Sequence, residues 1–461
     1  MFEHISVAAS RRPGSPTSAA TRDLRSWLAG YILAATGVAA IPVGLNRPSL
    51  WLVWGICICL LALVYLVILH RTSPVRSLQI ARMPWLLGLA LAIPAYGAIQ
   101  ALPLGRWLDL DGLRASISLL PSASSMGALR FTFYIVFAML VLEAANRRDR
   151  AELMSRGLFA AAVAQALWAL VALRLFGDMH YWGEKTAYLG AATGTFINRN
   201  ALATYLGMGG CLGIALMSQG LGRPRGASLA LLAATGLAII ALALFATQSR
   251  MGIAASALGW ALCVTLVFWQ RMPPLLQASW SAVLLLAPLC VLVLGSDALL
   301  LRVFETESDL RERLAGYTLV LQLIAERPVL GHGFDAFRPA FERVHLAPLD
   351  PSLIWDRAHS TYLSHWVELG LLAGSLPLLL GLALGWRLFR RAGALPAAAL
   401  AALVIASTHA LVDFSLEMPA NAILLIAILG LGLAPVASPQ DSPRSNLKPN
   451  MRRPRPQSQD N

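Results

Sequence analysis

The stretch Trp355–Gly374, WDRAHSTYLSHWVELGLLAG, places a polar His359-Ser360 pair directly before a long apolar run. Together with the apolar residues that follow it, the run reaches the length of about 20 residues that a helix needs to cross a bilayer. The pattern therefore predicts a histidine held at the point where a helix enters a membrane.

The composition of the whole chain is that of a polytopic membrane protein. Of its 461 residues, 57% are hydrophobic and only 13% are charged, whereas soluble domains carry roughly 25% charged residues. The net charge of +13 comes from basic residues in short loops between apolar runs, which is a signal of topology and not of nucleic-acid binding. The five cysteines all lie inside apolar runs, so we expect neither a disulfide framework nor a metal site.

Twelve apolar segments are long enough to span a membrane. They lie near residues 27–45, 50–70, 84–102, 129–146, 157–176, 199–218, 228–247, 251–269, 274–296, 362–386, 394–413 and 418–436. If both termini are cytoplasmic, every predicted inside segment carries at least one basic residue, as the positive-inside rule requires. We therefore predict an all-α polytopic membrane protein of about twelve transmembrane helices.

This topology divides the chain into five parts. We predict a basic cytoplasmic tail at 1–26, transmembrane helices 1–9 at 27–296, a periplasmic loop at 297–361, helices 10–12 at 362–436, and a disordered cytoplasmic tail at 437–461. The last part is rich in Pro, Ser, Arg and Gln and nearly free of apolar residues, a composition typical of disorder.

The large loop contains an amphipathic helix by its sequence pattern. From Thr306 it reads TESDLRERLAGYTLVLQLIAERP, with Thr306 and Asp309 spaced as a capping box and with Pro328 and a Gly331-His332-Gly333 turn at its end. Apolar residues recur along one helix face. They are Leu310, Leu314, Tyr317, Leu321 and Ile324. Such a helix on the outer face of the bundle could present Arg311 or Arg313 inward.

Arg250 is the polar residue that most needs an explanation. It ends the sequence Thr247-Gln248-Ser249-Arg250, between two apolar runs with almost no loop separating them. It is either an interfacial arginine that reaches toward water or a charged donor fork aimed at phosphate oxygens. The neighbouring Gln248 and Ser249 favour a residue that lines a cavity.

Other polar residues near the predicted spans have simpler explanations available. Asn198, Arg199 and Asn200 start the sixth span, where asparagine is a favoured helix N-cap. His409 and Asp413 are four residues apart, so we expect a hydrogen bond between them on one helix face. Ionisable groups within membrane spans are nevertheless functional candidates by default.

Glu368 is a further ionisable candidate within a span. It lies nine residues after His359, which places the two side chains on opposite sides of a continuous helix, so we expect no direct pairing between them.

These features together resemble the O-antigen ligase and polymerase superfamily. The resemblance covers Thr193 to Asn421 and rests on three elements: TQSR at a helix junction, an arginine-bearing loop before the Gly-His-Gly turn, and His359-Ser360 with nine residues before Gly370. It implies a fold similar to multi-helix GT-C-like glycosyltransferases in the bacterial inner membrane. The implied reaction is metal-independent and needs no cofactor: a glycan passes from undecaprenyl pyrophosphate to an acceptor hydroxyl at the periplasmic face.

The resemblance also implies roles for individual residues. The residue matching His359 would activate the acceptor hydroxyl, and those matching Arg250 and Arg313 would bind the donor pyrophosphate. The chemistry agrees, because histidine is a suitable base at neutral pH and fixed arginines stabilise a departing anion. His332 and His345 are weaker candidates for the base.

The acceptor stays open at the level of the sequence. An O-antigen ligase would use lipid A-core, a polymerase of O-antigen or exopolysaccharide would use another repeat unit, and a protein-directed relative would use Ser or Thr. A transporter or flippase of polysaccharide or lipid-linked sugar is the alternative function. A transporter should gather its polar groups near mid-bilayer, whereas these gather at one predicted face.

Overall fold

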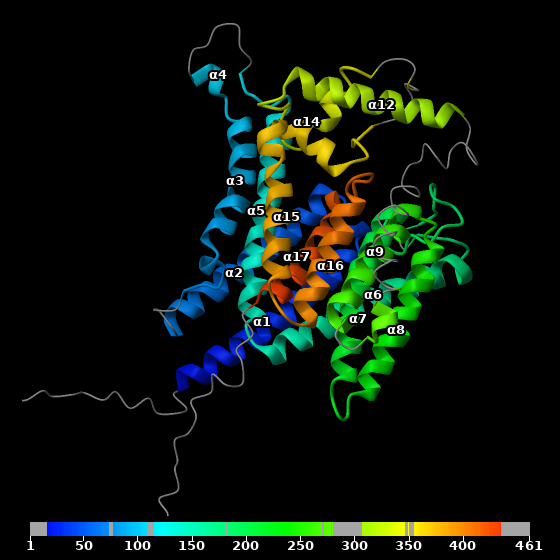
Figure 1. Ribbon diagram of the computed structural model, residues 1–461. Helices are drawn as coiled ribbons and strands as arrows, with labels where there is room; N and C mark the ends of the chain where they lie inside the picture. Colours follow the sequence, from blue (N-terminus) through cyan, green and yellow to red (C-terminus); the bar gives the residue numbers. More distant parts are fainter. Residues whose placement is uncertain are drawn as a thin grey trace, which may run out of the picture.

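The computed structural model describes residues 16–72, 77–107, 115–180, 183–269, 272–277, 279, 307–345, 349 and 355–434, with side chains described from 24 in the first helix and from 315 in the helix that begins at 307. This part of the chain is built from helices (Figure 1). The membrane bundle contains α1 (Pro16–Ala40), α2 (Pro48–Thr72), α3 (Pro84–Ala101), α5 (Pro121–Ala144), α6 (Arg148–Leu175), α7 (Arg199–Leu221), α8 (Ala227–Ala246), α9 (Arg250–Phe268), α14 (Thr361–Gly374), α15 (Leu376–Phe389), α16 (Ala394–His409) and α17 (Pro419–Leu433). Three helices lie at one end of it, namely α4 (Leu104–Trp107), α12 (Glu307–Glu326) and α13 (Phe337–Phe341).

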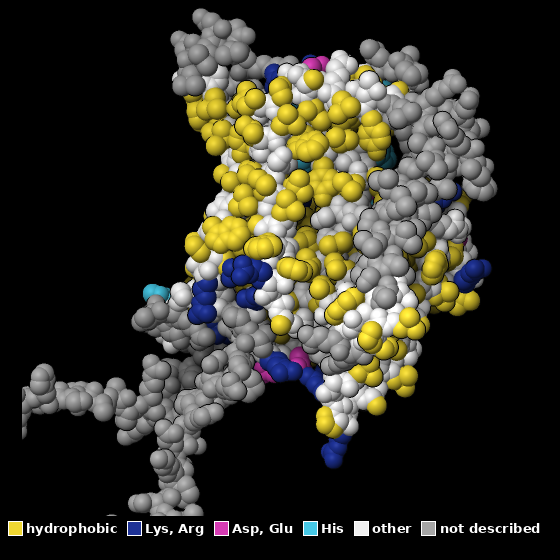
Figure 2. Space-filling view, in the orientation of Figure 1, with side chains coloured by type: hydrophobic (Ala, Val, Ile, Leu, Met, Phe, Trp, Pro, Cys, Tyr) yellow, Lys and Arg dark blue, Asp and Glu magenta, His cyan; other side chains and the backbone are white. Residues whose placement is uncertain are grey.

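Seven of the described helices are long and apolar enough to cross a membrane, or eight when the bent pair α14–α15 counts as one span. Hydrophobic side chains cover the middle of the face seen in Figure 2, and a group of Lys and Arg side chains lies near the end opposite α12. The prediction of an all-α polytopic membrane protein is therefore confirmed. The segment 274–296 lies mostly outside the described residues, so the count of twelve spans stays a prediction.

Helix α7 is the centre of the bundle. In its most apolar stretch 94% of the residues are buried, against 28–39% in the other six spanning helices. It packs against α6, α8, α9, α16 and α17. Glycines allow this close packing, because a Cβ on Gly209 would lie 2.4 Å from the Cβ of Ala162 and one on Gly207 would lie 2.1 Å from Ser256 Oγ. Small residues at helix contacts are the usual means of close packing in membranes.

The predicted span at 362–386 is not one continuous helix, although the pair α14–α15 can still count as one bent span. The axes of α14 and α15 meet at 71°, and Gly370 has left-handed backbone angles (φ 75°, ψ 170°) inside α14. The apolar sequence alone does not reveal the interruption at Gly370, because this interruption depends on backbone contacts with residues 328–333, which include the Gly-His-Gly turn. There His332 N donates to Val367 O (2.9 Å) and Gly333 N donates to Glu368 O (2.9 Å), while Leu371 N donates to Pro328 O (2.7 Å).

The predicted amphipathic helix is present as α12, and it lies across the end of the bundle near α14 (Figure 1). Its buried face overlaps the predicted stripe only in part. Val320, Leu323 and Ile324 pack against Phe337 and Phe341 of α13, whereas Leu321 is 58% exposed. The sequence periodicity identified the helix but not which of two adjacent apolar stripes meets α13 and α14.

A buried carboxylate joins the helices at the opposite end of the bundle. Glu143 is fully buried and accepts hydrogen bonds from Arg25 (2.7 Å), from Tyr65 Oη (2.8 Å) and from Gln79 N (2.6 Å). These donors come from α1, α2 and the segment before α3. Burying a carboxylate costs free energy, and hydrogen bonds from several donors offset that cost.

The substitution Glu143→Ala should lower the free energy of unfolding by about 3–5 kcal/mol, because it leaves the Arg25 charge buried without its partner. Thermal unfolding of the purified protein in detergent measures the effect. Glu152→Ala is the matched control: Glu152 pairs with three partly exposed arginines, so its loss should cost about 1 kcal/mol or less. Equal melting temperatures for the two variants would contradict the structural role of Glu143.

Candidate active site

Three helices begin at the end of the bundle where α12 lies, and each begins with a side-chain cap. Asn198 caps α7, Ser249 caps α9 and Ser360 caps α14, each through an oxygen that accepts a hydrogen bond from a backbone N–H in the first turn. The predicted capping role of Asn198 is confirmed, with a distance of 2.7 Å to Asn200 N. Helix N-termini carry partial positive charge, so this arrangement favours anions.

A chain of hydrogen bonds connects these helix starts. Ser249 Oγ donates to Asn200 Oδ1 (2.8 Å), and Asn200 Nδ2 donates to Asp413 Oδ2 (2.7 Å). Thr361 Oγ1 then donates to the backbone oxygen of Asp413 (3.3 Å). Because Arg250 follows Ser249 and His359 lies two residues before Thr361, the chain links the region of the arginine to that of the histidine.

The predicted hydrogen bond between His409 and Asp413 is wrong. Helix α16 ends at His409, so the four-residue spacing no longer places both side chains on one helix face. His409 Nδ1 instead shares a hydrogen bond with Thr204 Oγ1 of α7, and the Asp413 carboxylate bonds to Asn200 and Ser415. Both residues are buried, and both hold α7 to the end of α16.

Two arginines stand at the first positions of α9 and α7. Arg250 is exposed and Arg199 is half-buried. The Arg199 guanidinium lies over the ring of Tyr188, 5.4 Å from its centroid. Among the residues that the structure describes, neither arginine forms an ion pair, so the described carboxylates leave both positive charges unneutralised.

His359 is exposed and lies between two aromatic rings. Its imidazole meets Trp355 (5.3 Å between ring centroids) and Phe414 (5.5 Å), both edge to face. Its backbone is left-handed, with a φ of 52°, which is uncommon for a residue with a side chain. The strained backbone and the two rings fix the direction of the imidazole. Such strain is typical of functional sites.

The arginines predicted on the loop helix are only partly described. Arg311 and Arg313 lie in the first turns of α12, and their side chains are outside the described part. Their contact with a donor stays a prediction.

Glu368 has a structural partner. It is buried, and its Oε1 accepts from Phe337 N (3.2 Å). Its backbone oxygen accepts from the side chain of Gln100 (2.9 Å), which also accepts from Phe334 N (2.9 Å). These contacts tie the middle of α14 to α3 and α13.

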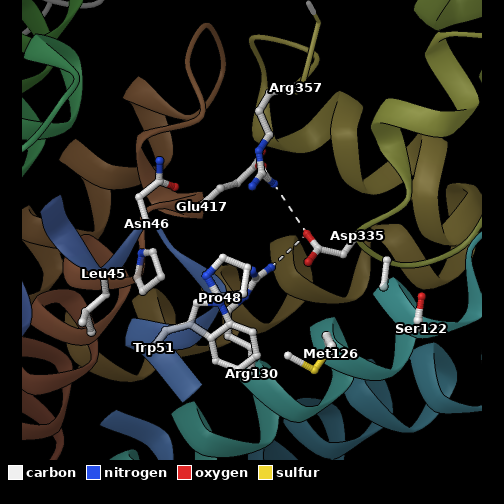
Figure 3. Close-up of a pocket in the computed structure, with 12 residues that line it drawn as sticks. Leu45, Asn46, Pro48, Trp51, Ser122, Met126, Arg130, Asp335, Arg357 and Glu417 are labelled. Carbon is white, nitrogen blue, oxygen red and sulfur yellow. Dashed lines mark hydrogen bonds and ion pairs between the residues drawn. The ribbon is translucent and has the colours of Figure 1, made fainter. Parts of the chain in front are cut away.

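A second group of charged residues was missed by the sequence reasoning. Asp335 bridges two arginines, at 3.1 Å to Arg130 and 3.6 Å to Arg357, and Arg357 also pairs with Glu417 (2.5 Å). Figure 3 shows both guanidinium groups directed at Asp335. The four residues line a cavity of about 300 Å³. Arg130 inside the predicted span 129–146 was the one available signal, because its partners come from distant loops.

The charges in this group stabilise one another. Burial acts to raise the pKa of Asp335, but Arg130 and Arg357 outweigh it and hold that pKa below its usual value. Burial raises the pKa of Glu417, and the guanidinium of Arg357 opposes the shift. Two arginines thus pair with two carboxylates, so the charges that line the cavity nearly cancel. Among the described residues, no three His, Cys, Asp or Glu side chains are arranged to hold a metal ion.

The fold and these sites define a helical integral membrane protein whose candidate site residues lie at the end of the bundle with α12. Residues 235–378 match the family model described as O-Antigen ligase. The matched segment contains Arg250, α12, the Gly-His-Gly turn and His359. The match confirms the resemblance to the O-antigen ligase and polymerase superfamily and supports an activity of that general type. No curated protein matches the chain.

The bend at Gly370 gives a direct test of the architecture around His359. A Cβ added there would lie 2.3 Å from Val329 O on a backbone with a φ of 75°, so Gly370→Ala should destabilise the protein by about 1–3 kcal/mol. Thermal unfolding measures the change. Gly88→Ala in α3 is the control, since a Cβ there meets nothing within 4 Å. A Gly370→Ala protein as stable as the control would show that the left-handed bend is not required.

Proposed function

We propose that this protein transfers a glycan from undecaprenyl pyrophosphate to an acceptor hydroxyl, as an O-antigen ligase or a polymerase of O-antigen or exopolysaccharide. In this proposal the end of the bundle with α12 faces the periplasm of a bacterium, and both termini lie in the cytoplasm. The observation that supports the proposal is the hydrogen-bond chain Ser249–Asn200–Asp413–Thr361. It links the neighbourhood of Arg250, the proposed pyrophosphate site, to that of His359, the candidate base.

The donor pyrophosphate would bind at Arg250, with Arg199 beside it on the neighbouring helix. Both residues start helices whose N-termini attract anions, and guanidinium groups match phosphate oxygens in a bidentate geometry. Exposed apolar residues at the end of α8, Leu242 (62%) and Phe245 (65%), offer a lipid-facing surface for the hydrocarbon chain next to Arg250. Arg313 on α12 is the further predicted ligand.

His359 would act as the general base. The acceptor oxygen attacks the anomeric carbon of the donor sugar, and its proton passes to the imidazole. The bond between that carbon and the pyrophosphate oxygen breaks, and undecaprenyl pyrophosphate leaves as an anion. Arginines placed at the leaving group stabilise the charge that develops there. The energy comes from the pyrophosphate linkage, so no nucleotide is consumed.

One observation favours the alternative of a transporter or flippase. Transporters often bind substrate at discontinuous helices, and α14 and α15 form such a bent pair. The polar residues of the site, however, lie at the helix starts and in the segments that join them, away from the middle of the bundle. Uptake of a labelled lipid-linked sugar into vesicles, without glycan transfer, would support the transporter.

His359→Ala and His359→Asn should both abolish glycan transfer while the protein level stays unchanged. Asparagine tolerates the left-handed backbone, so the second variant removes the base without adding backbone strain. The measurement is the surface glycan of a strain that carries each variant. His345→Asn is the control and should retain the polysaccharide. Normal polysaccharide with His359→Asn would remove the catalytic assignment.

Arg250→Lys should lower glycan transfer by about 10- to 100-fold, because a point charge does not replace the bidentate fork. Transfer by the purified protein from a lipid-pyrophosphate donor provides the readout. The matched control is Arg225→Lys, an exposed arginine in the connection between α7 and α8 at the far end of these helices, which should act as wild type. If Arg250→Lys also had wild-type activity, the residue would be merely interfacial.

A further inference from the structure

Lys185 is a buried lysine in an exposed stretch of chain. It lies in the segment that joins α6 to α7, and residues 183–190 of this segment are exposed apart from Lys185. Its side chain is only 1% exposed, and its Nζ donates to Asp178 Oδ1 (2.7 Å) and to the backbone oxygen of Ala191. Burying a charge costs free energy unless close partners offset it. The burial of this charge outside the packed helices therefore indicates a local role for the ion pair.

The ion pair ties the exposed stretch to the end of α6. Asp178 lies three residues after that helix, and its N donates to Ala172 O (3.1 Å). Its second carboxylate oxygen, Oδ2, accepts from Gly190 N (2.6 Å). One carboxylate therefore binds both Lys185 and the far end of the stretch, so residues 188–192 are fixed relative to α6.

Tyr188, in the fixed part of the stretch, contacts the first arginine of the candidate site. The Arg199 guanidinium lies over its ring, 5.4 Å from the ring centroid, a distance at which a cation and an aromatic face attract each other. The Nε of Arg199 is buried and has no hydrogen-bond partner in the part of the chain that the structure describes. The ring therefore helps to orient this guanidinium.

The same stretch contacts the junction of α8 and α9, where the second arginine begins α9. Ala192 N donates to Ala246 O (2.8 Å), at the last residue of α8, and Gln248 Nε2 donates to Gly190 O (2.9 Å). Gln248 lies two residues before Arg250. Loss of these contacts would therefore free the turn that precedes Arg250.

Three of the residues that make these contacts have strained backbones. Asp178, Tyr188 and Gln248 have φ angles of 59°, 56° and 55°, which are uncommon for residues other than glycine. Such conformations persist where surrounding contacts hold them, and they are typical of functional sites. Lys185 and Asp178 both bind the backbone just after Tyr188, so the ion pair is one of the constraints on this conformation.

We propose that Lys185 is a positioning residue for the donor. Through its ion pair with Asp178 it fixes residues 188–192, and these hold Arg199 and the turn before Arg250 in the geometry that binds a pyrophosphate. Lys185 itself is buried and does not touch the ligand. The inference rests on the proposed function and deepens it, because donor binding then depends on a residue outside the two helices that carry the arginines.

Lys185→Met tests this role, because methionine keeps the apolar stem and removes the charge. The Asp178 side chain is 21% exposed and keeps its bond to Gly190, so we expect the variant to fold. In the full-length protein in lipid nanodiscs, amide hydrogen exchange in residues 183–192 should become faster, and the Kd for farnesyl pyrophosphate should rise about tenfold. In glycan transfer, the KM for the lipid-pyrophosphate donor should rise by a similar factor, while kcat and the KM for the acceptor stay within about twofold.

A matched control and a double variant separate positioning from general damage. Arg223→Met breaks a 2.6 Å ion pair with Glu152 beyond the other end of α7, and it should bind the probe as the wild type does. Tyr188→Asn/Gln248→Asn removes both side-chain contacts with the arginine-bearing helix starts, and asparagine tolerates the left-handed backbone. This double variant should weaken binding with the ion pair intact. Adding Lys185→Met to it should weaken binding further by less than about twofold, because the changes act along one path.

Wild-type affinity for the probe in Lys185→Met would overturn the proposal, and so would an equal rise in the KM for the acceptor. A further loss of about tenfold on adding Lys185→Met to the double variant would show that Lys185 acts elsewhere. If farnesyl pyrophosphate does not bind the wild-type protein, the anion site and this role are removed together. The proposed function fails separately if the wild-type protein binds the probe, and Lys185→Met weakens that binding, but no glycan is transferred.

Discussion

The carboxylate of Asp413 is the interaction on which the site depends. It is 3% exposed and lies just beyond the end of α16, where its side chain bonds to Asn200 of α7 and to Ser415. Through its backbone oxygen it also holds the first residue of α14. A buried carboxylate must be satisfied by such donors, because an unpaired charge there is costly. The same contacts that satisfy it fix Arg250 and His359 relative to each other.

Two residues with positive φ, His359 just before α14 and Gly370 inside it, give this arrangement its shape. At Gly370 the chain turns, with Val367 and Glu368 bonded to the Gly-His-Gly turn and Leu371 bonded to Pro328. His359 turns the chain before the helix cap at Ser360. Between them the helix is short and is tied by Glu368 to α13 and α3. His359 is thus carried by a rigid unit and not by a free loop.

Features that depend on local sequence could be predicted, and features that depend on tertiary contacts could not. Apolar length identified the helices, and the asparagine at 198 identified a cap, because both are properties of one segment. The group formed by Arg130, Asp335, Arg357 and Glu417 joins four distant segments, so no spacing in the chain reveals it. The predictions of an unbroken helix at Gly370 and of Asp413 as the partner of His409 were wrong for the same reason. The apolar periodicity of α12 found the helix but could not say which stripe is buried.

The burial of α7 has a consequence for how the protein is made. This helix packs against α16 and α17 as well as against its sequence neighbours, and those two helices leave the ribosome after α7 because they lie later in the chain. Until they insert, one side of α7 faces lipid or the translocation machinery, and Asn200 lacks Asp413. The contacts of Asp413 that join the starts of α7 and α14 therefore form only after α16 has been made. A product that stops before Asp413 would lack the contact that links Asn200 of α7 to Thr361 of α14.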